Sequence, residues 1–82
     1  WLTLHAREGR YRLRRPIREL EAELDPARFA RIHRATLLAL CEVRELHPLP
    51  DGDYGVVLHD GTVLNLSRSY RDAFLARLRG AG

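Results

Sequence analysis

Two short stretches at the start of the chain alternate between apolar and polar residues. Leu2 and Leu4 are the apolar positions of the first stretch. Tyr11 and Leu13 are those of the second, where the residues around them are arginines. A period of two is typical of a β-strand with one buried face. The pattern predicts two extended segments joined at the sequence "REG", the second of which presents its arginines to water.

A helical period follows these two segments. Ile17, Leu20 and Leu24 fall on one face of a helix, and Pro16 suits its first turn, where a backbone N–H is not needed. Asp25 is then expected to cap a single further turn within "DPARF". The sequence therefore predicts one short helix near the centre of the chain.

The segment "ARIHRATLLALCEVREL" has a pattern that fits two structures. Its alanines and leucines favour a helix. A strand buried on both faces fits equally well, with Ile32, Leu38 and Leu40 on one side and Leu37 and Ala39 on the other. Periodicity alone does not separate a buried strand from a buried helix. Both structures stay open at this point.

The sequence "YGVVLHDGTVLNLS" predicts a β-hairpin. Two alternating runs flank Asp60 and Gly61, a pair that tolerates the positive φ angles of a type I′ turn. The preceding "HPLPDGD" holds two prolines and an Asp-Gly pair, so it is expected to be a loop.

The end of the chain has the pattern of a helix. Ser69 and Asp72 resemble a capping box at its start, Phe74 and Leu78 lie on its inner face, and Gly80 is expected to end it. Because strands dominate and the helices are peripheral, the predicted class is mainly β with short helices (α+β). Residues 1–82 are long enough for a single domain.

Charge is distributed along the chain in blocks. All fourteen cationic residues are arginine. Residues 1–18 hold six of them against Glu8, whereas residues 19–26 hold four acids and no base. If the fold gathers the basic blocks, the net charge of +3 conceals a basic face, which is the footprint of an anionic partner such as DNA or RNA. Solvated arginines that reflect coding bias are the alternative.

The apolar stretches and the single cysteine bear on location. No apolar run approaches the roughly 18–20 residues of a membrane-spanning helix, and nothing resembles a signal peptide. Cys41 has no partner for an internal disulfide, which is compatible with a reducing, cytoplasmic location. Its apolar neighbours predict a buried side chain.

No constellation of residues indicates catalysis. The four histidines lack the close spacing of metal ligands, and Ser67 lacks the glycine-flanked turn that exposes a nucleophilic serine. A glycine-rich phosphate loop is also missing. We therefore expect neither an enzyme nor a bound metal or cofactor.

Two cationic clusters, "RIHR" and "SRSYR", adjoin elements of regular structure. Arginine offers planar donors that bind guanine O6 and N7 together or grip a phosphate. The serine hydroxyls beside them add phosphate donors. For any single arginine, pairing with a nearby carboxylate is an equally good account, but two clusters in one small domain favour binding.

The same residues resemble the LytTR DNA-binding domain family of bacterial transcription regulators. That family has a phenylalanine, an arginine and a His-Arg-Ser sequence leading into an apolar strand. A hairpin with a glycine turn, a Ser-Arg pair and a final helix follow. The residues at the corresponding positions are Phe29, Arg31, His33, Arg34, Ala35, Asp60, Gly61, Leu64, Ser67 and Arg68. The resemblance spans nearly the whole chain. The family's first strands have no counterpart in it, so Trp1 is expected to fall inside the domain.

The resemblance implies an unusual fold of several small antiparallel sheets that inserts loops into successive major grooves of double-stranded DNA. It implies base reading by Arg34 and Arg68, with His33 beside them. The expected phosphate contacts are Arg31, Ser67, Ser69 and Arg71. Family members bind paired repeats in promoters as homodimers. They carry an N-terminal receiver domain, as response regulators of two-component systems do, or a membrane-embedded sensor, so the chain is expected to be the C-terminal part of a longer regulator.

Two positions depart from the family pattern. Ala35 stands where the family has a serine, which removes a hydroxyl that could contact backbone or phosphate. Ala39 stands where an asparagine is usual, which weakens a turn or a hydrogen bond. Neither departure touches Arg34 or Arg68. The predicted function is a sequence-specific DNA-binding output domain. The alternative is a protein-interaction or dimerisation module whose arginine-rich face meets an acidic partner.

Overall fold

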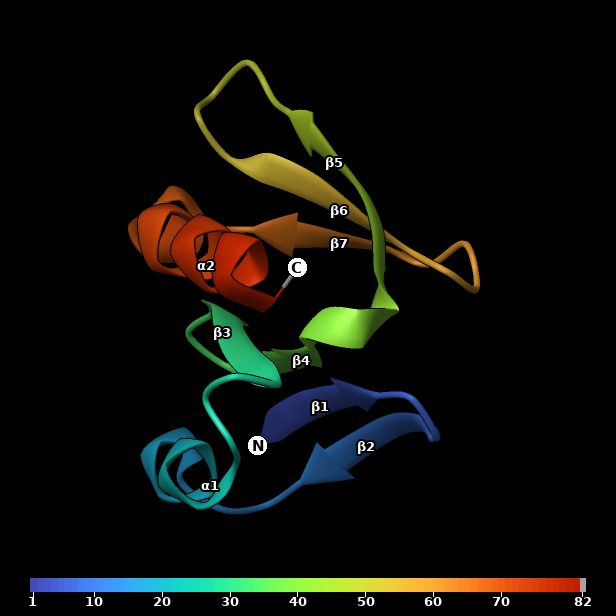
Figure 1. The fold of residues 1–82 in the computed structure, drawn as a ribbon. Helices are drawn as coiled ribbons and strands as arrows, with labels where there is room; N and C mark the ends of the chain where they lie inside the picture. Colours follow the sequence, from blue (N-terminus) through green and yellow to red (C-terminus); the bar gives the residue numbers. More distant parts are fainter. Residues whose placement is uncertain (82) are drawn as a thin grey trace.

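The computed structural model describes residues 1–81, which form two β-sheets and two α-helices (Figure 1). The four-stranded sheet has the order β2-β1-β4-β3, and the three-stranded sheet has the order β5-β6-β7. The elements are β1 (Leu2–Ala6), β2 (Gly9–Leu13), α1 (Ile17–Glu23), β3 (Phe29–His33), β4 (Thr36–Ala39), the 3-10 turn η1 (Leu40–Glu42), β5 (Val43–Pro48), β6 (Tyr54–Leu58), β7 (Val63–Leu66) and α2 (Arg68–Ala81).

The ambiguous segment, residues 30–46, forms most of β3, all of β4, the turn η1 and the start of β5. β3 and β4 pair antiparallel, and β4 also pairs with β1 on its other side. Leu37 and Leu38 are adjacent and both are buried, Leu37 against α1 and Leu38 against the second sheet. Adjacent residues point to opposite faces of a strand, whereas a helix would bury only one stripe. The β4 strand is therefore an inner strand of the four-stranded sheet, with a neighbouring strand on each side and buried residues on each face.

The pairing of β1 with β4 is parallel, with Leu4 opposite Leu37. All other strand pairs are antiparallel. The prediction of a mainly β fold with small sheets is thus confirmed. One parallel pair is an addition that alternation along a single strand cannot reveal.

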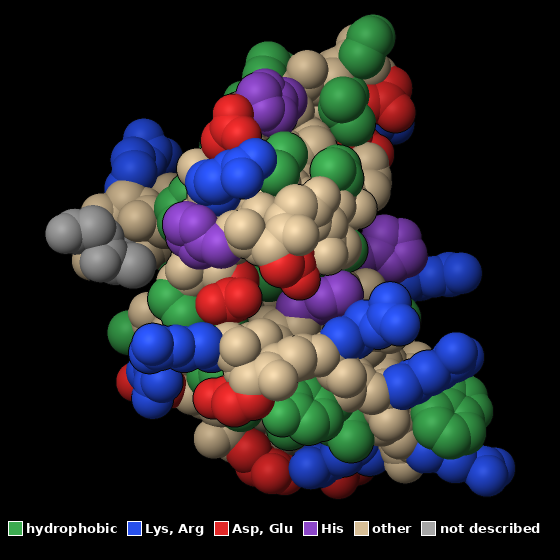
Figure 2. Space-filling view, turned by 90° about the vertical axis from the view of Figure 1, so that its right-hand side faces the viewer, with side chains coloured by type: hydrophobic (Ala, Val, Ile, Leu, Met, Phe, Trp, Pro, Cys, Tyr) green, Lys and Arg blue, Asp and Glu red, His purple; other side chains and the backbone are tan. Residues whose placement is uncertain are grey.

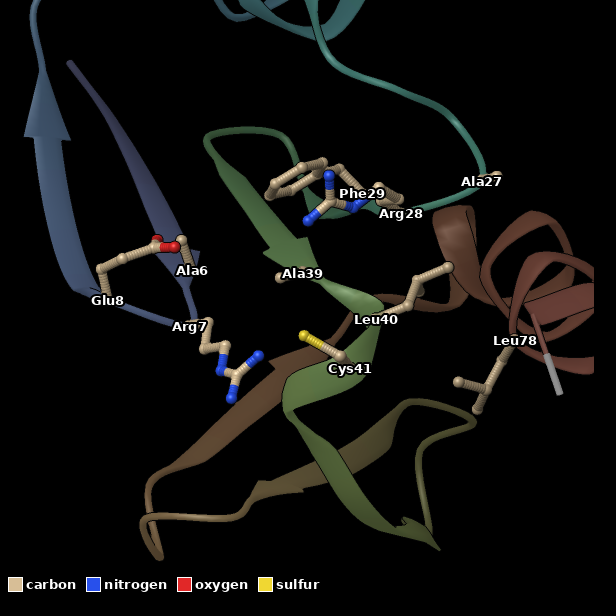
Figure 3. Close-up of a pocket in the computed structure, with 10 residues that line it drawn as sticks. All are labelled: Ala6, Arg7, Glu8, Ala27, Arg28, Phe29, Ala39, Leu40, Cys41 and Leu78. Atoms are coloured by element: carbon tan, nitrogen blue, oxygen red, sulfur yellow. The ribbon is translucent and has the colours of Figure 1, made fainter.

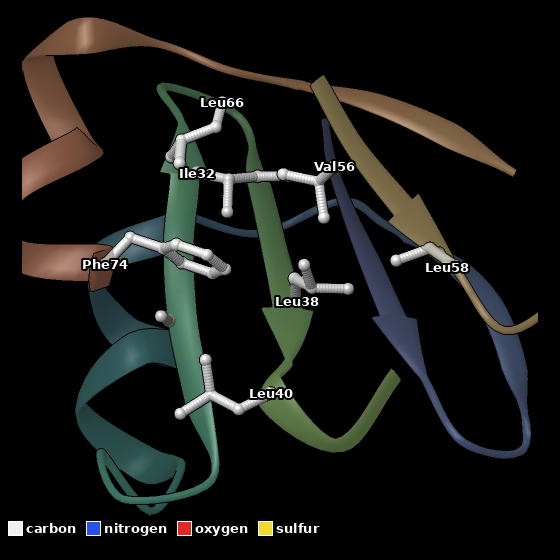
Figure 4. Packing of buried hydrophobic residues seen from close by; sticks show 8 residues of the cluster. Ile32, Leu38, Leu40, Val56, Leu58, Leu66 and Phe74 are labelled. Carbon is white, nitrogen blue, oxygen red and sulfur yellow. The ribbon is translucent and has the colours of Figure 1, made fainter. Parts of the chain in front are cut away.

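Two cores lie on the two faces of the four-stranded sheet. The larger core joins this sheet to β6, β7 and α2 (Figure 4). Its buried side chains are Ala30, Ile32, Leu38, Leu40, Val56, Leu58, Leu66 and Phe74. The smaller core holds Leu2, Leu20 and Leu37, with Ile17 and Leu24 packed against it. The predicted inner faces of both helices are therefore confirmed.

The turn between β6 and β7 differs from the predicted type. A type I′ turn needs positive φ at both central residues. Gly61 has φ 90°, but within residues 1–81 no residue other than glycine has positive φ, so Asp60 does not. Gly61 donates to the carbonyl of Leu58, and the side chain of Asp60 accepts from the N–H of Thr62 at 2.9 Å. The turn is thus closed by one left-handed glycine, which is the form of three-residue hairpin loops.

Both ends of the C-terminal helix were predicted wrongly. The α2 helix begins at Arg68, so Ser69 lies in its first turn and does not form a capping box with Asp72. Instead, the N–H of Ser69 faces the hydroxyl of Ser67 at 3.4 Å. Gly80 also lies inside the helix, which extends to Ala81. The turn at Asp25, by contrast, is confirmed, because its carboxylate accepts from Ala27 and its carbonyl accepts from Arg28 and Phe29.

We predict that Leu38→Ala destabilises the domain by about 2–5 kcal/mol, because it leaves a cavity where three layers meet. Urea denaturation followed by circular dichroism measures this loss. Val63→Ala is the matched control. Its side chain is 66% exposed, so a change within about 0.5 kcal/mol is expected. Equal losses for the two variants would contradict the central position of β4.

Candidate nucleic-acid interface

The turn between β3 and β4 carries two of the predicted site residues. His33 ends β3 and Arg34 follows it, and both are exposed. Arg31, two residues before His33 in the same strand, folds its guanidinium back to this turn. It donates from Nε to the carbonyl of His33 at 3.2 Å and from Nη2 to the carbonyl of Arg34 at 2.6 Å. The backbone that carries Arg34 is therefore fixed by a neighbouring side chain.

Arg31 is itself held on three sides. Its guanidinium carbon lies 5.0 Å from the centre of the Tyr70 ring, and its Nη1 lies 3.9 Å from a carboxylate oxygen of Glu21. Only 20% of its side chain is exposed. Arg31 thus links α1, α2 and the β3–β4 turn. Its place in the structure is that of a support for Arg34, and its predicted phosphate contact stays a prediction.

The second cluster lies directly beside the first. The N–H of Ser67 donates to the carbonyl of Ile32 at 2.9 Å, which joins the end of β7 to the end of β3. His33 directly follows Ile32 in the chain, and Arg68 directly follows Ser67. The structure therefore brings the "RIHR" and "SRSYR" sequences together, although more than thirty positions separate them in the chain.

The backbone of Arg68 is held by a residue that the sequence did not indicate. Asp53, in the loop between β5 and β6, accepts from the backbone N–H of Arg68 at 2.8 Å and from the side-chain amide of Asn65 at 3.0 Å. The hydrogen bond from Asn65, and then that from Arg68, lowers the pKa of the Asp53 carboxyl below its ordinary value. A carboxylate at the first N–H groups of a helix also suits the helix dipole.

Arg71 ties the same loop to the helix. Its Nη1 donates to the carbonyl of Gly52 at 2.9 Å, and its Nε lies 3.4 Å from Asp72. Gly52 has φ 95°, which favours glycine, so the loop reaches α2 through a backbone shape that other residues rarely adopt. Arg71 and Asp53 therefore clamp the β5–β6 loop onto the start of α2.

Six of the seven predicted site residues fall into two groups, and the seventh, Ser67, is half-buried and joins β7 to β3. His33, Arg34, Arg68 and Ser69 are exposed, and no side-chain ion pair involves either arginine within residues 1–81. Arg31 and Arg71 instead donate hydrogen bonds to backbone carbonyls. The first group can meet a ligand without breaking a contact, and the second group positions the first.

Cys41 is exposed, so the prediction of a buried thiol is wrong. Directly after β4 the chain turns into η1, which carries this residue to the surface. Cys41 lines a pocket of about 540 Å³ together with Arg7, Arg28 and Leu78 (Figure 3). None of the predicted site residues lines this pocket.

Over residues 1–81, no helix is long and apolar enough to cross a membrane. Within the same residues, no three side chains of His, Cys, Asp or Glu gather as ligands of a metal would.

A β-rich domain that presents arginines on a turn and on the adjoining start of a helix has the features of a nucleic-acid-binding domain. The sequence pattern of the LytTr DNA-binding domain family matches residues 2–79. The chain therefore belongs to this family, as its resemblance to that family implied.

Known proteins agree with this assignment. The chain is 29% identical over 76 residues to the transcriptional regulatory protein LytR of Staphylococcus aureus strain MW2, and 28% identical to that of strain N315. The match covers 93% of this chain but 31% of each relative's length. Among solved structures, the LytTr DNA-binding domain of a putative methyl-accepting/DNA response regulator from Bacillus cereus is similar, with a TM-score of 0.71 and 21% identity. That match covers 85% of this chain and 62% of the other, and it shows the same fold.

The pKa of Asp53 leads to a prediction on acid stability. Because the pKa is lower in the folded state, the ionised carboxylate stabilises the fold above its unfolded-state pKa. This contribution is lost as the pH falls through the folded-state pKa. We expect the melting temperature of the wild type to fall more steeply below about pH 5 than that of Asp53→Asn. Glu8→Gln removes an exposed carboxylate elsewhere and should follow the wild type. Parallel curves for the wild type and Asp53→Asn would refute the role of Asp53.

The position of Arg31 leads to a prediction on turn rigidity. Arg31→Lys keeps the positive charge but cannot reach two carbonyls with a planar fork. We expect faster hydrogen exchange at the amides of residues 33–35, measured by NMR. Arg28→Lys changes an exposed arginine in the preceding turn and should leave these rates unchanged. Unaltered exchange in Arg31→Lys would show that the turn does not depend on this side chain.

Proposed function

We propose that this domain is the sequence-specific DNA-binding output domain of a bacterial transcription regulator. In this proposal Arg34 and Arg68 enter major grooves of double-stranded DNA and read base edges, with His33 beside Arg34. The support is the hydrogen bond between Ser67 and Ile32, which brings the turn that carries Arg34 beside the start of α2 that carries Arg68.

Rigidity is the physical reason for choosing base reading. A guanidinium that takes guanine O6 and N7 together discriminates by about 1–3 kcal/mol, and only while its direction is maintained. Arg34 stands on a turn whose carbonyls Arg31 holds, and Arg68 stands on a helix start that Asp53 caps. The backbone that carries each arginine is therefore held in place before any ligand arrives.

Phosphate contacts are proposed for the residues around these two. Ser67 and Ser69 lie at the start of α2, where their hydroxyls can donate to a phosphate. Arg71 uses Nη1 for Gly52 and lies beside Asp72 through Nε, which leaves Nη2 for a phosphate. Arg31 uses Nε and Nη2 for the turn, so its phosphate contact would come from Nη1, which lies 3.9 Å from Glu21. Ala35 supplies no hydroxyl at its position, which places more of the phosphate binding on α2.

The proposal extends to the longer protein. The chain spans about a third of the length of the curated relatives it matches, which leaves room for a second domain in proteins of that size. We propose an N-terminal receiver or membrane-embedded sensor domain, dimerisation on paired repeats, and action in the cytoplasm, where bacterial promoters are accessible.

Selection from genomic DNA tests the proposed function directly. Purified protein is incubated with sheared genomic DNA at near-physiological salt, and the bound fragments are sequenced. Enrichment of a paired short repeat upstream of genes is the expected result. Uniform recovery of fragments would refute sequence-specific reading and would favour an acidic protein as the partner of the arginines.

Arg34→Ala and Arg68→Ala are each expected to weaken binding to the selected repeat about ten- to a hundred-fold and to lower its preference over random duplex. Fluorescence anisotropy measures both quantities. Arg79→Ala is the matched control, because this exposed arginine lies eleven residues along α2, roughly 16 Å from Arg68. Variants that fold normally and bind like the wild type would remove these two residues from the interface.

A further inference from the structure

A groove with a cationic lining adjoins the β3–β4 turn. It runs between the β1–β2 hairpin and β7, and its volume is about 690 Å³. His33 lies in its wall, so the groove borders the turn that carries Arg34. The other polar side chains in its wall are Arg10, Arg12, Thr36 and Asn65, with Thr3, His5 and Thr62. None of the residues that line it is an acid.

The strand pairing directs Arg10 and Arg12 into this groove. In β2 they lie opposite His5 and Thr3 of β1, so residues of the same face of the sheet line one wall. The β2 strand is at the edge of its sheet and is exposed except at Leu13. The guanidinium carbon of Arg12 also lies 5.4 Å from the centre of the Trp1 ring, which limits its rotation.

Arg10 and Arg12 are not neutralised inside the chain. Within residues 1–81, no ion pair involves either of them. Figure 2 shows cationic side chains gathered along one edge of the molecule, beside histidines. Glu8, Glu42 and Asp60 lie beyond Arg10, in an adjoining depression at the β1–β2 turn that shares His5, Arg10 and Thr62 with the groove. The positive end of the groove is thus the end nearest His33.

His5 does not add to this charge at neutral pH. Its burial, and then the neighbouring Arg10, lowers the pKa of its imidazole and outweighs the opposite effect of Asp60. The charge of the groove therefore comes from its two arginines, and the threonines and Asn65 supply neutral donors. A chain of phosphates, with one charge at each step, matches a row of arginines and neutral donors.

We propose that this groove holds the phosphate backbone of the DNA that Arg34 reads, and that Arg10 and Arg12 each neutralise a phosphate. This inference rests on the proposed function and adds a second flank to it. The start of α2 contacts the backbone on one side of the turn, and the groove contacts it on the other. The arginines of β2 therefore contribute affinity that is independent of sequence.

The salt dependence of binding tests the inference. The double variant Arg10→Gln/Arg12→Gln is compared with the wild type on the selected repeat and on random duplex. The slope of log K against log salt is expected to become shallower by roughly 1.8, about 0.9 for each phosphate that the variant no longer neutralises. The ratio of the two affinities should stay unchanged, because phosphate contacts carry no sequence information.

The matched control is Arg18→Gln/Arg79→Gln, which removes the same charge from two exposed positions on α1 and α2. Its slope should stay close to that of the wild type. Arg10→Lys/Arg12→Lys keeps both charges and should retain the wild-type slope. Melting temperatures establish that every variant is folded.

The outcomes separate this inference from the proposed function. If the wild type binds no DNA, the proposed function fails. If the wild type binds its repeat and the Arg10→Gln/Arg12→Gln slope equals that of the control, only the groove assignment fails. A changed affinity ratio in this variant, or a shallower slope in the lysine variant, would also overturn it, since either result shows an interaction other than charge neutralisation.

Discussion

One backbone hydrogen bond relates the two parts of the proposed recognition surface to each other. The N–H of Ser67 donates to the carbonyl of Ile32, and these residues directly precede Arg68 and His33. Ile32 is 1% exposed and packs in the larger core, so one partner of the bond cannot move without disturbing that core. The spacing of the two turns is therefore set by main-chain geometry. Side chains on them can change without changing this spacing.

The strands that the sequence predicted are mainly those with one buried face and one face exposed to solvent. The alternation around Leu4 and the runs on either side of Gly61 each mark such a strand. The alternation around Tyr11 also marks a strand, although β2 is exposed except at Leu13. The β4 strand could not be distinguished from a helix, because Leu37 and Leu38 are both buried and no polar residue reveals the period. Its parallel pairing with β1 was also invisible, since a strand's own pattern does not identify its neighbour.

The site was predictable to the extent that it is local in sequence. The clusters around Arg34 and Arg68 are visible in the sequence as arginines beside apolar runs, and the fold brings them together. Asp53 was missed because it lies fifteen residues from Arg68 in a loop whose composition indicates only a turn. The internal role of Arg31 was missed for a related reason. Whether an arginine binds its own backbone or a ligand depends on distances that only the folded chain defines.

The edge position of β2 has a consequence for solubility. A strand at the edge of a sheet exposes unpaired N–H and C=O groups on which another chain can add a strand. Here that edge carries Arg10, Arg12 and, just beyond its end, Arg14, and a second copy approaching edge to edge would bring the same charges against them. The opposite edge strand, β3, is covered by α2. The row of arginines therefore also disfavours the addition of a second copy to the four-stranded sheet at β2.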